Sequence, residues 1–288
     1  MRASMVMDSV VGFGPRDHLC LAYDDPATFA TKAVAFLADG LAQGLQVRYV
    51  SASSSHEIAD LRDWLLDELA PDRADAVQIE SVRDTYGLGH VVSVGEQVTA
   101  YANATSAALA AGFAGLRVAA DATPLVTTPQ QLDAFARYEH QIDRYMSRHP
   151  FSAMCGYDRA VLGTDAVAEL ACLHPVSNAA TMFRWHAAES GDGPPRAGGP
   201  VEVVLAGEID RSVHALLRKA LQRIDLEQGQ LVELDVAGLD FIDHHAIAEL
   251  DALGRRHQAR IVLRNPGHLV TRVVELMTPE TVGVGTPA

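Results

Sequence analysis

Four of the histidines and cysteines in the first 174 residues are candidate metal ligands: His18 and Cys20 share one short apolar run, and Cys155 and His174 follow much later. Residues two apart on a β-strand point to the same face, so His18 and Cys20 could meet Cys155 if their strands lie near each other. Imidazole and thiolate bind soft metals and haem iron. The alternative is that the cysteines are small buried apolar residues and His18 a hydrogen-bonded edge residue, because the spacing matches no standard zinc pattern.

A second set of polar residues follows the expected strands of the first half of the chain. Parallel sheets bind ligands at the carboxyl ends of their strands, so these residues predict a small-molecule site at that edge. Each of them could instead serve only as a helix cap or turn residue. The set consists of Tyr23, Asp24, Ser51, Ser53, Arg83, Tyr86, Asp121, Tyr157 and Asp158.

A third candidate is Asp243-His244-His245, which follows the apolar run 231–236. Neighbours on a helix diverge by about 100° and neighbours on a strand face opposite ways, so we expect that the two histidines do not serve one site. A partner-facing His244 is favoured over a catalytic one, and pH-sensitive docking is an alternative. The chain has no Ser-His-Asp order, nucleophile elbow, zinc-protease helix or dinucleotide glycine motif, so we expect no enzyme.

The elements that position these residues alternate between strand and helix. Apolar runs predict strands at 18–23, 45–50, 76–81, 116–120 and 152–157, and helical periodicity predicts helices at 29–41, 58–69, 96–111 and 129–145. Such alternation is typical of an α/β fold, with a parallel sheet that helices cover on both faces.

The stretch SGDGPPRAGGP at 190–200 divides the chain, because seven of its eleven residues are Gly or Pro. Beyond it, strands are expected at 201–206, 231–236 and 260–264, with helices at 213–224, 246–254 and 270–277. We therefore predict a lead-in at 1–15, a first domain at 16–186, a linker at 187–200, a small second α/β domain at 201–280 and a tail at 281–288.

The composition excludes several classes of partner. A net charge of −14 argues against nucleic acid and against an anionic membrane surface, both of which attract basic proteins. No apolar run is long enough to span a bilayer, and no signal peptide is evident. Three widely spaced cysteines suit free thiols in a reducing compartment, so we expect a cytoplasmic protein.

The second domain resembles the STAS domain of bacterial anti-sigma factor antagonists. The matching stretches are LAGEIDRS at 205–212, VELDVAGLDFID at 232–243 and LRNPGHLVTRVVELM at 263–277. The resemblance implies a partner-binding turn at Asp210, Asp243, His244 and His245. In that family the residue after the turn aspartate is commonly a Ser or Thr that a partner kinase phosphorylates. His244 occupies that position here, so the usual phosphoserine switch cannot operate.

The first domain resembles the MEDS domain, the DcmR-type sensory domain of methylotrophs and methanogens. The matching stretches are DHLCLAYDDP at 17–26, GFAGLRVAADAT at 112–123, and YEHQIDRY and AMCGYDRA between 138 and 160. The resemblance implies a derived RecA- or KaiC-like fold without a phosphate loop, which senses small organic molecules. No G-x-x-x-x-G-K-[ST] motif occurs, and the first strand is followed by two carboxylates, so nucleotide hydrolysis is not expected.

Together these observations predict a bacterial signalling regulator that acts on transcription. The first domain would sense a small-molecule ligand or a redox signal, and the second would bind an anti-sigma factor or a related kinase-fold protein. A homodimer is compatible with the sequence. Two alternatives stay open: a degenerate nucleotide-binding ATPase, and a sensor that contains haem or a metal ion.

Overall fold

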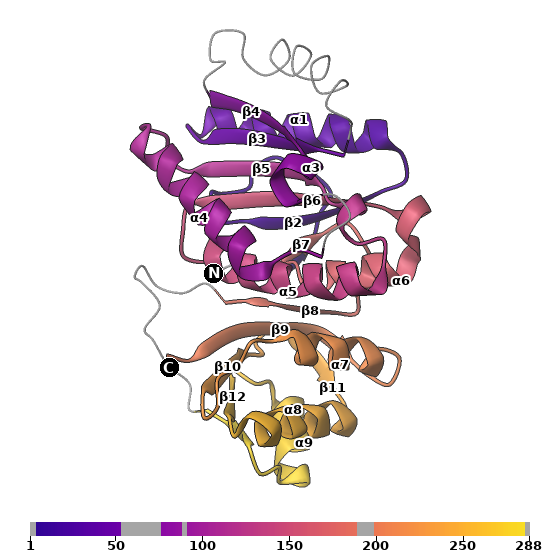
Figure 1. Cartoon of the computed structure of the whole chain (residues 1–288). Helices are drawn as coiled ribbons and strands as arrows, with labels where there is room; N and C mark the ends of the chain where they lie inside the picture. The colour runs from indigo at the N-terminus through magenta and orange to yellow at the C-terminus, as the bar shows by residue number, and fades with distance from the viewer. Residues whose placement is uncertain (1–3, 53–75, 88–90, 189–198, 286–288) are drawn as a thin grey trace. The chain divides into compact units, whose positions relative to one another are not determined.

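The computed structural model describes residues 4–52, 76–87, 91–188 and 199–285 (Figure 1). The chain forms two compact units. One comprises residues 5–171 and 176–180, and the other comprises residues 1–4, 172–175 and 181–288. We call them the first and the second unit and describe each by itself.

The first unit is built on a seven-stranded sheet in which every pair of neighbouring strands is parallel. The strand order is β1-β7-β2-β6-β5-β3-β4. Parallel neighbours need a crossover connection, and the helices between the strands supply it. The strands are β1 (Met5–Val6), β2 (His18–Tyr23), β3 (Gln46–Ser51), β4 (Val77–Ser81), β5 (Leu116–Asp121), β6 (Phe151–Asp158) and β7 (Val176–Ser177). The predicted parallel α/β fold is confirmed.

Local signals set where the helices of this unit begin. Asp25 accepts hydrogen bonds from the first backbone N–H groups of α1, and Thr128 forms a capping box with Gln131 at the start of α5. The helices are α1 (Pro26–Ala42), α3 (Val82–Tyr86), α4 (Val94–Ala110), α5 (Pro129–Met146) and α6 (Arg159–Ala171), with a short 3₁₀ turn at Thr123–Leu125. The sequence did not predict α3 or α6, and the helix expected at 58–69 lies outside the described residues.

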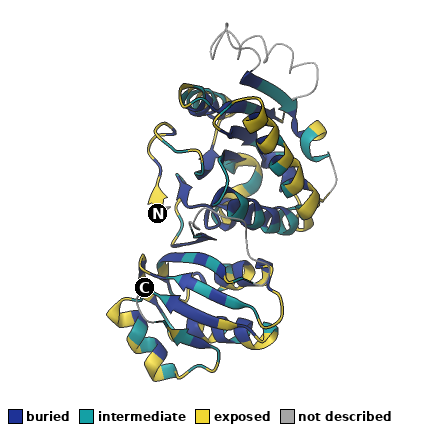
Figure 2. Ribbon diagram, turned by 90° about the vertical axis from the view of Figure 1, so that its left-hand side faces the viewer, coloured by how far each residue is buried: buried dark blue, intermediate teal, exposed yellow. Residues whose placement is uncertain are grey.

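The sheet has apolar packing on both faces. Along β2, Leu19 and Leu21 join the core beneath α1, whereas Cys20 and Ala22 join the core beneath α4 and α5. Figure 1 shows α4 and α5 against the sheet, and Figure 2 shows dark blue, buried strands between helices with exposed outer faces. The period of two along a strand therefore assigns His18 to the face that α5 covers.

A buried arginine attaches the N-terminal segment to this core. Arg117 of β5 donates to Asp39 Oδ2 at 2.8 Å, to the Phe13 carbonyl at 2.6 Å and to Ser152 Oγ at 3.1 Å. Its guanidinium carbon also lies 4.6 Å from the ring centroid of Phe36. The predicted lead-in is thus part of the fold, and it also supplies strand β1, which pairs with β7.

The second unit contains a six-stranded mixed sheet. The strands β11-β9-β10-β12-β13 are parallel neighbours in that order, and β8 pairs antiparallel with β9. Its strands are β8 (Phe183–Ala187), β9 (Val201–Ile209), β10 (Leu231–Asp235), β11 (Leu239–Ile242), β12 (Arg260–Arg264) and β13 (Val282–Val284). Its helices are α7 (His214–Arg223), α8 (His244–His257) and α9 (His268–Met277).

Two boundaries differ from the prediction. Residues 181–187, expected at the end of the first domain, group with the second unit because β8 pairs with β9 from Phe183↔Gly207 to Ala187↔Val203. The expected tail after residue 280 includes β13, which pairs with β12. Of the linker predicted at 187–200, residues 189–198 lie outside the described residues, and Ala187 is the last residue of β8. Short edge strands carry too little apolar periodicity to stand out in the sequence.

Candidate functional site

A fully buried polar network lies between β2 and α5 of the first unit. His18 begins β2, and Glu139 and Asp143 occupy positions i and i+4 of α5, so both carboxylates face the same side of the helix. His18 Nδ1 lies 3.1 Å from Asp143 Oδ1, and His18 Nε2 lies 3.1 Å from Glu139 Oε2. Burial alone lowers the pKa of His18, but the hydrogen bonds and the negative charge of the two carboxylates outweigh it and raise that pKa.

Strand β6 adds a thiol and a phenol to this network. The Tyr157 hydroxyl donates to Glu139 Oε1 at 2.6 Å, and Cys155 Sγ lies 3.7 Å from His18 Nε2. Burial and the neighbouring Glu139 carboxylate raise the pKa of both Cys155 and Tyr157 well above their ordinary values. The order Asp143, His18, Cys155 resembles a nucleophilic triad, but a fully buried thiol with a raised pKa is a poor nucleophile.

A second group lies at the carboxyl edge of the same sheet. The Tyr23 hydroxyl donates to Asp121 Oδ1 at 2.9 Å and lies 3.2 Å from Thr123 Oγ1. Thr123 Oγ1 in turn accepts the backbone N–H of Asp158 at 3.0 Å. Burial, with a contribution from Asp158, raises the pKa of Asp121. Hydroxyl and carboxyl groups from the ends of β2 and β5 and from Thr123 therefore lie together at this edge. Burial, and next the negative charge of Asp121, raise the pKa of Tyr49 on β3.

In the second unit, Asp243 lies at the junction of β11 and α8. It is the N-cap of α8, and its Oδ1 accepts the backbone N–H of Ala246 at 3.0 Å. His214, the first residue of α7, places its Nε2 at 2.8 Å from Asp243 Oδ2 and 3.0 Å from Oδ1. Two strand-to-helix junctions are thus joined through one carboxylate.

The rings of the two exposed histidines of this junction lie side by side, and whether both serve one site stays a prediction. The ring centroids of His244 and His245 are 4.1 Å apart, and His245 meets His214 edge-on at 5.4 Å. Side chains at the first turn of a helix point partly along its axis, so the 100° divergence of their Cα positions does not keep the rings apart. His214 was not predicted, although it follows the LAGEIDRS stretch by two residues.

Comparison with known families assigns both units. The family model described as the methanogen/methylotroph DcmR sensory domain, MEDS, matches residues 17–175, which is more than half of the chain. The chain belongs to the MEDS family. A second model, described as a Mlab-type STAS domain, matches residues 193–281. Both resemblances seen in the sequence are thereby confirmed, and no curated protein matches the chain.

The pair of domains indicates a signalling or regulatory protein of the anti-sigma factor antagonist type. Within the residues that the model describes, no helix is both long and apolar enough to cross a membrane. The four residues of the turn implied by the STAS resemblance are placed as follows: Asp243 caps α8 beside His244 and His245, and Asp210 lies at the neighbouring junction, where it accepts from the backbone N–H and hydroxyl of Ser212.

The MEDS domain brings some of the predicted metal ligands together. One potential ligand atom from each of His18, Glu139 and Cys155 lies within 4.8 Å of the others, and all three residues are buried. Cys20 shares the face of β2 with His18 but is outside this set. His174 is fully buried on residues 172–175, which group with the second unit. The sequence analysis missed Glu139, although it stands on the buried stripe of α5 beside Phe135 and Ile142.

The predicted ligand residues of the MEDS domain separate into distinct environments. Tyr23, Asp121 and Asp158 converge at the carboxyl edge as expected. Tyr157 belongs to the buried network, and Asp24 forms an exposed ion pair with Arg159 at 2.8 Å. The remaining members are Ser51, buried at the end of β3; Arg83, exposed on α3; Tyr86, whose hydroxyl lies 2.9 Å from that of Tyr101; and Ser53, which lies outside the described residues.

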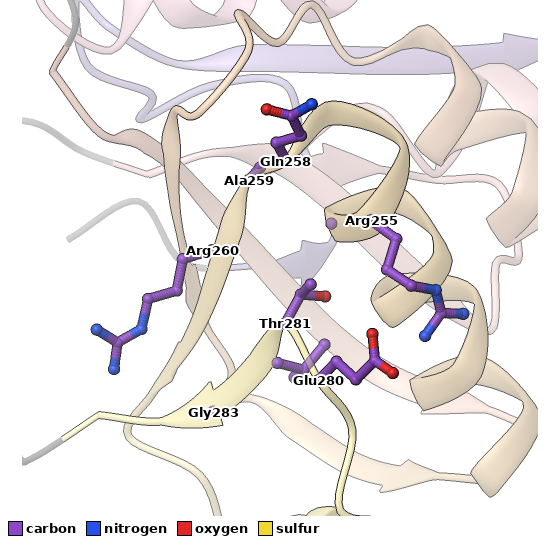
Figure 3. Close-up of a pocket in the computed structure, with 9 residues that line it drawn as sticks. Arg255, Gln258, Ala259, Arg260, Glu280, Thr281 and Gly283 are labelled. Atoms are coloured by element: carbon purple, nitrogen blue, oxygen red, sulfur yellow. The ribbon is translucent and has the colours of Figure 1, made fainter.

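The STAS domain also has a surface hollow at the opposite strand ends. Arg260 begins β12 and Val282 begins β13, and the hollow lies between these amino ends and the end of α8 (Figure 3). Arg255, on its rim, pairs with Asp251, and Thr281 Oγ1 donates to the same aspartate at 2.8 Å. These polar contacts connect α8 to Thr281, the residue before β13.

Proposed function

We propose that the protein is a ligand-responsive regulator. Its MEDS domain binds a small polar organic molecule, and its STAS domain binds an anti-sigma factor of the kinase fold in the cytoplasm. The observation that carries the proposal is the junction of β11 and α8, where Asp243 caps the helix and an exposed His244 stands in the place of the phosphorylatable hydroxyl. The proposal includes no catalytic activity of the chain itself.

Control of partner binding by the MEDS domain is proposed because the STAS junction has no hydroxyl at position 244 that a kinase could phosphorylate. Phosphorylation breaks an antagonist interface by adding negative charge, and position 244 offers no hydroxyl to modify. The STAS surface is then constitutively competent unless another signal acts on it. A ligand can supply that signal only if it binds two states of the protein unequally.

The carboxyl edge of the MEDS sheet favours a neutral or cationic ligand. The Asp121 carboxyl accepts from the Tyr23 hydroxyl, and the negative charge of Asp158 contributes to the raised pKa of both Tyr23 and Asp121. An anion would be repelled there, whereas alcohols, amides and amines could exchange hydrogen bonds with these groups. The degenerate-ATPase alternative is disfavoured by the same charge and by Asp25, whose carboxylate caps α1 where a phosphate would bind.

The output half is tested with the full-length protein and the anti-sigma factors of the same genome. Isothermal titration calorimetry should find one that binds, and Asp243→Ala should weaken it at least tenfold by loosening the start of α8. Asp235→Ala removes a carboxylate that caps a different turn, where it accepts from Ala237 N–H and Asn265, and it should leave the affinity unchanged. Absence of binding to every anti-sigma factor would reject this half of the proposal.

The sensing half is tested by thermal shift of the full-length protein against a panel of small alcohols, amides, amines and carboxylates. Neutral or cationic compounds should raise Tm, and Tyr23→Phe should remove the shift. Arg137→Ala, which changes an exposed side chain of α5 outside the predicted ligand set, is the matched control. A response confined to carboxylates, or one that Tyr23→Phe leaves intact, would contradict the proposed edge site.

A metal-dependent sensor is the second candidate, and the convergence of His18, Glu139 and Cys155 favours it. Imidazole, carboxylate and thiolate together suit zinc or iron, and a bound cation would lower the pKa of the Cys155 thiol, which burial and the Glu139 carboxylate raise. Haem fits less well, because these side chains contact one another within the core and leave no room among them for a porphyrin.

Elemental analysis and an absorption spectrum of freshly purified protein test this candidate. A stoichiometric metal that Glu139→Gln removes, but Glu169→Gln retains, would establish the buried group as its site. Glu169 is a matched control because it is also buried on a helix of the MEDS domain. Protein that purifies without metal and takes up none during refolding with zinc or iron would exclude the candidate.

A further inference from the structure

Three imidazoles and a carboxylate gather at one edge of the STAS sheet. His214 comes from the junction of β9 and α7, and Asp243, His244 and His245 come from the junction of β11 and α8. Because β9 and β11 are parallel neighbours, both junctions lie at the same edge of the sheet. We infer that this cluster is a binding site for a divalent transition-metal ion of the zinc, nickel or copper class.

His214 and Asp243 form a preorganised pair of ligands. Their side chains are only 17% and 16% exposed, and Nε2 of His214 lies 2.8 Å from Oδ2 of Asp243. Two ligand atoms of a tetrahedral zinc ion lie about 3.3 Å apart, given metal-ligand bonds of about 2.0–2.1 Å. An ion can therefore replace the shared proton if the two atoms separate by about 0.5 Å. The hydrogen bond from Ala246 N–H holds the carboxylate in place.

His245 and His244 supply the remaining ligands. Both are exposed; the ring of His245 contacts those of His244 and His214, and among the described residues these side chains do not already form a converged ligand set. Metal binding therefore requires a side-chain rotation of His245, whose ring centroid is already 5.4 Å from that of His214. Exposed side chains change rotamer on a picosecond to nanosecond timescale, so this rotation is not a barrier.

The ligand set selects the class of ion. Imidazole with carboxylate suits zinc, nickel and copper, whereas calcium and magnesium prefer sites made only of oxygen ligands. Asp210 adds negative charge nearby: hydrogen bonds from Ser212 lower its pKa, and His214 contributes to the same shift. The inference needs neither an anti-sigma factor nor an organic ligand, so it stands or falls separately from the proposed function.

Calorimetry of the full-length protein after chelator treatment tests the site, with zinc and nickel chlorides as probes. One ion per chain should bind with micromolar or tighter affinity. His214→Ala and His245→Ala should each weaken binding at least about 10-fold, because the loss of a group that only supports a metal ligand already costs about 10- to 100-fold. His268→Ala should change nothing, because His268 is an exposed histidine at the first position of another helix, α9.

Three results would overturn the inference: no binding of zinc or nickel by the wild-type chain, an affinity in His214→Ala and His245→Ala equal to that of wild type, or calcium binding as tight as that of zinc. Unchanged thermal melting of His245→Ala, an exposed position, would show that lost binding does not reflect lost folding. The same variants distinguish this site from the buried His18 group, because an ion bound at His18 would remain bound in both His214→Ala and His245→Ala.

Discussion

His18 Nε2 and Glu139 Oε2 lie 3.1 Å apart, and neither side chain is exposed to solvent. An ion pair at this depth is stable only as a pair, because either partner alone would be a buried charge without compensation. It also fixes α5 against β2, since the two residues belong to different elements of the MEDS domain. This relationship makes the stability of the domain depend on pH.

The pH dependence has a definite sign. The pKa of His18 is raised in the folded state, so its contribution to stability is complete below the unfolded value of about 6.5 and is lost as pH rises through the folded value. The free energy of unfolding lost in Glu139→Gln should therefore be largest at acidic pH and shrink toward alkaline pH. Urea unfolding between pH 5.5 and 9 measures it; a difference between wild type and variant that grows with pH would contradict the pairing.

The second prediction concerns the contribution of the buried Arg117 to stability. Its side chain is fully buried, and it donates to Asp39 and to the carbonyl of Phe13. Arg117→Ala should lower the free energy of unfolding by about 3–5 kcal/mol, the usual cost of removing one partner of a buried ion pair. Arg137→Ala removes an exposed i,i+4 pair with Asp133 and should cost less than about 0.5 kcal/mol.

The two arginine variants are compared by chemical denaturation of the full-length protein. An equal loss in the free energy of unfolding in both variants would show that Arg117 stabilises the fold no more than an exposed arginine does. Limited proteolysis gives a second readout, since Arg117→Ala should expose the segment around Phe13 to cleavage while Arg137→Ala should not.

A third prediction concerns Asp121 at the carboxyl edge. Burial raises its folded pKa, so the contribution of Asp121 is most favourable below the unfolded pKa of about 3.9 and declines as pH rises through the folded value. Asp121→Asn keeps an oxygen that can accept from Tyr23 and Thr123 but removes the charge. The variant should therefore gain stability relative to wild type as pH rises from 4 to 7.

Thermal melting across that pH range, with Asp158→Asn for comparison, checks the third prediction. The pKa of Asp121 is raised partly by Asp158, so that variant should reproduce part of the gain. A melting difference that does not change with pH would mean that the charge of Asp121 carries no cost. If removing the charge of Asp121 at the carboxyl edge raises stability, that result would be typical of a functional site.

The sequence predicts the repeating strands and helices of the MEDS sheet well, because apolar period and turn residues are local signals. The residue limits of β2 and β12 agree with the prediction. It does not predict β8, whose partner β9 is the next strand in the chain but lies beyond the Gly/Pro-rich stretch. The antiparallel pairing of a short edge strand depends on tertiary contacts, which a local sequence pattern does not indicate.

The candidate sites show the same contrast between what local sequence signals predict and what depends on tertiary contacts. His18 and Cys155 were predicted because their residue types suggest ligands, but Glu139 and Asp143 were not, because acidic residues on a helix usually face solvent. The pairing of His214 with Asp243 joins residues 29 apart, and only the neighbouring positions of β9 and β11 bring them together. Chemistry that depends on such pairings becomes visible only in the folded chain.

The last prediction restores a hydroxyl at the STAS junction. Position 244 is the first residue of α8, directly after its cap Asp243, and a phosphate added there would meet the free N–H groups and positive end of the helix dipole. If the partner is a kinase-fold anti-sigma factor, His244→Ser should become a phosphoryl acceptor with ATP and should then bind the partner at least tenfold more weakly. Wild type should bind equally with and without ATP.

Mass spectrometry of the chain after incubation with the partner and ATP identifies the modified position. His268→Ser is the matched control, because it places a hydroxyl at the first residue of α9, where no partner surface is proposed. Phosphate at both positions would indicate unspecific transfer, and phosphate at neither would show that the partner does not recognise this junction as a substrate. Phosphate confined to position 244, with release of the partner, would locate the output surface at Asp243 and attribute its constitutive state to a single residue.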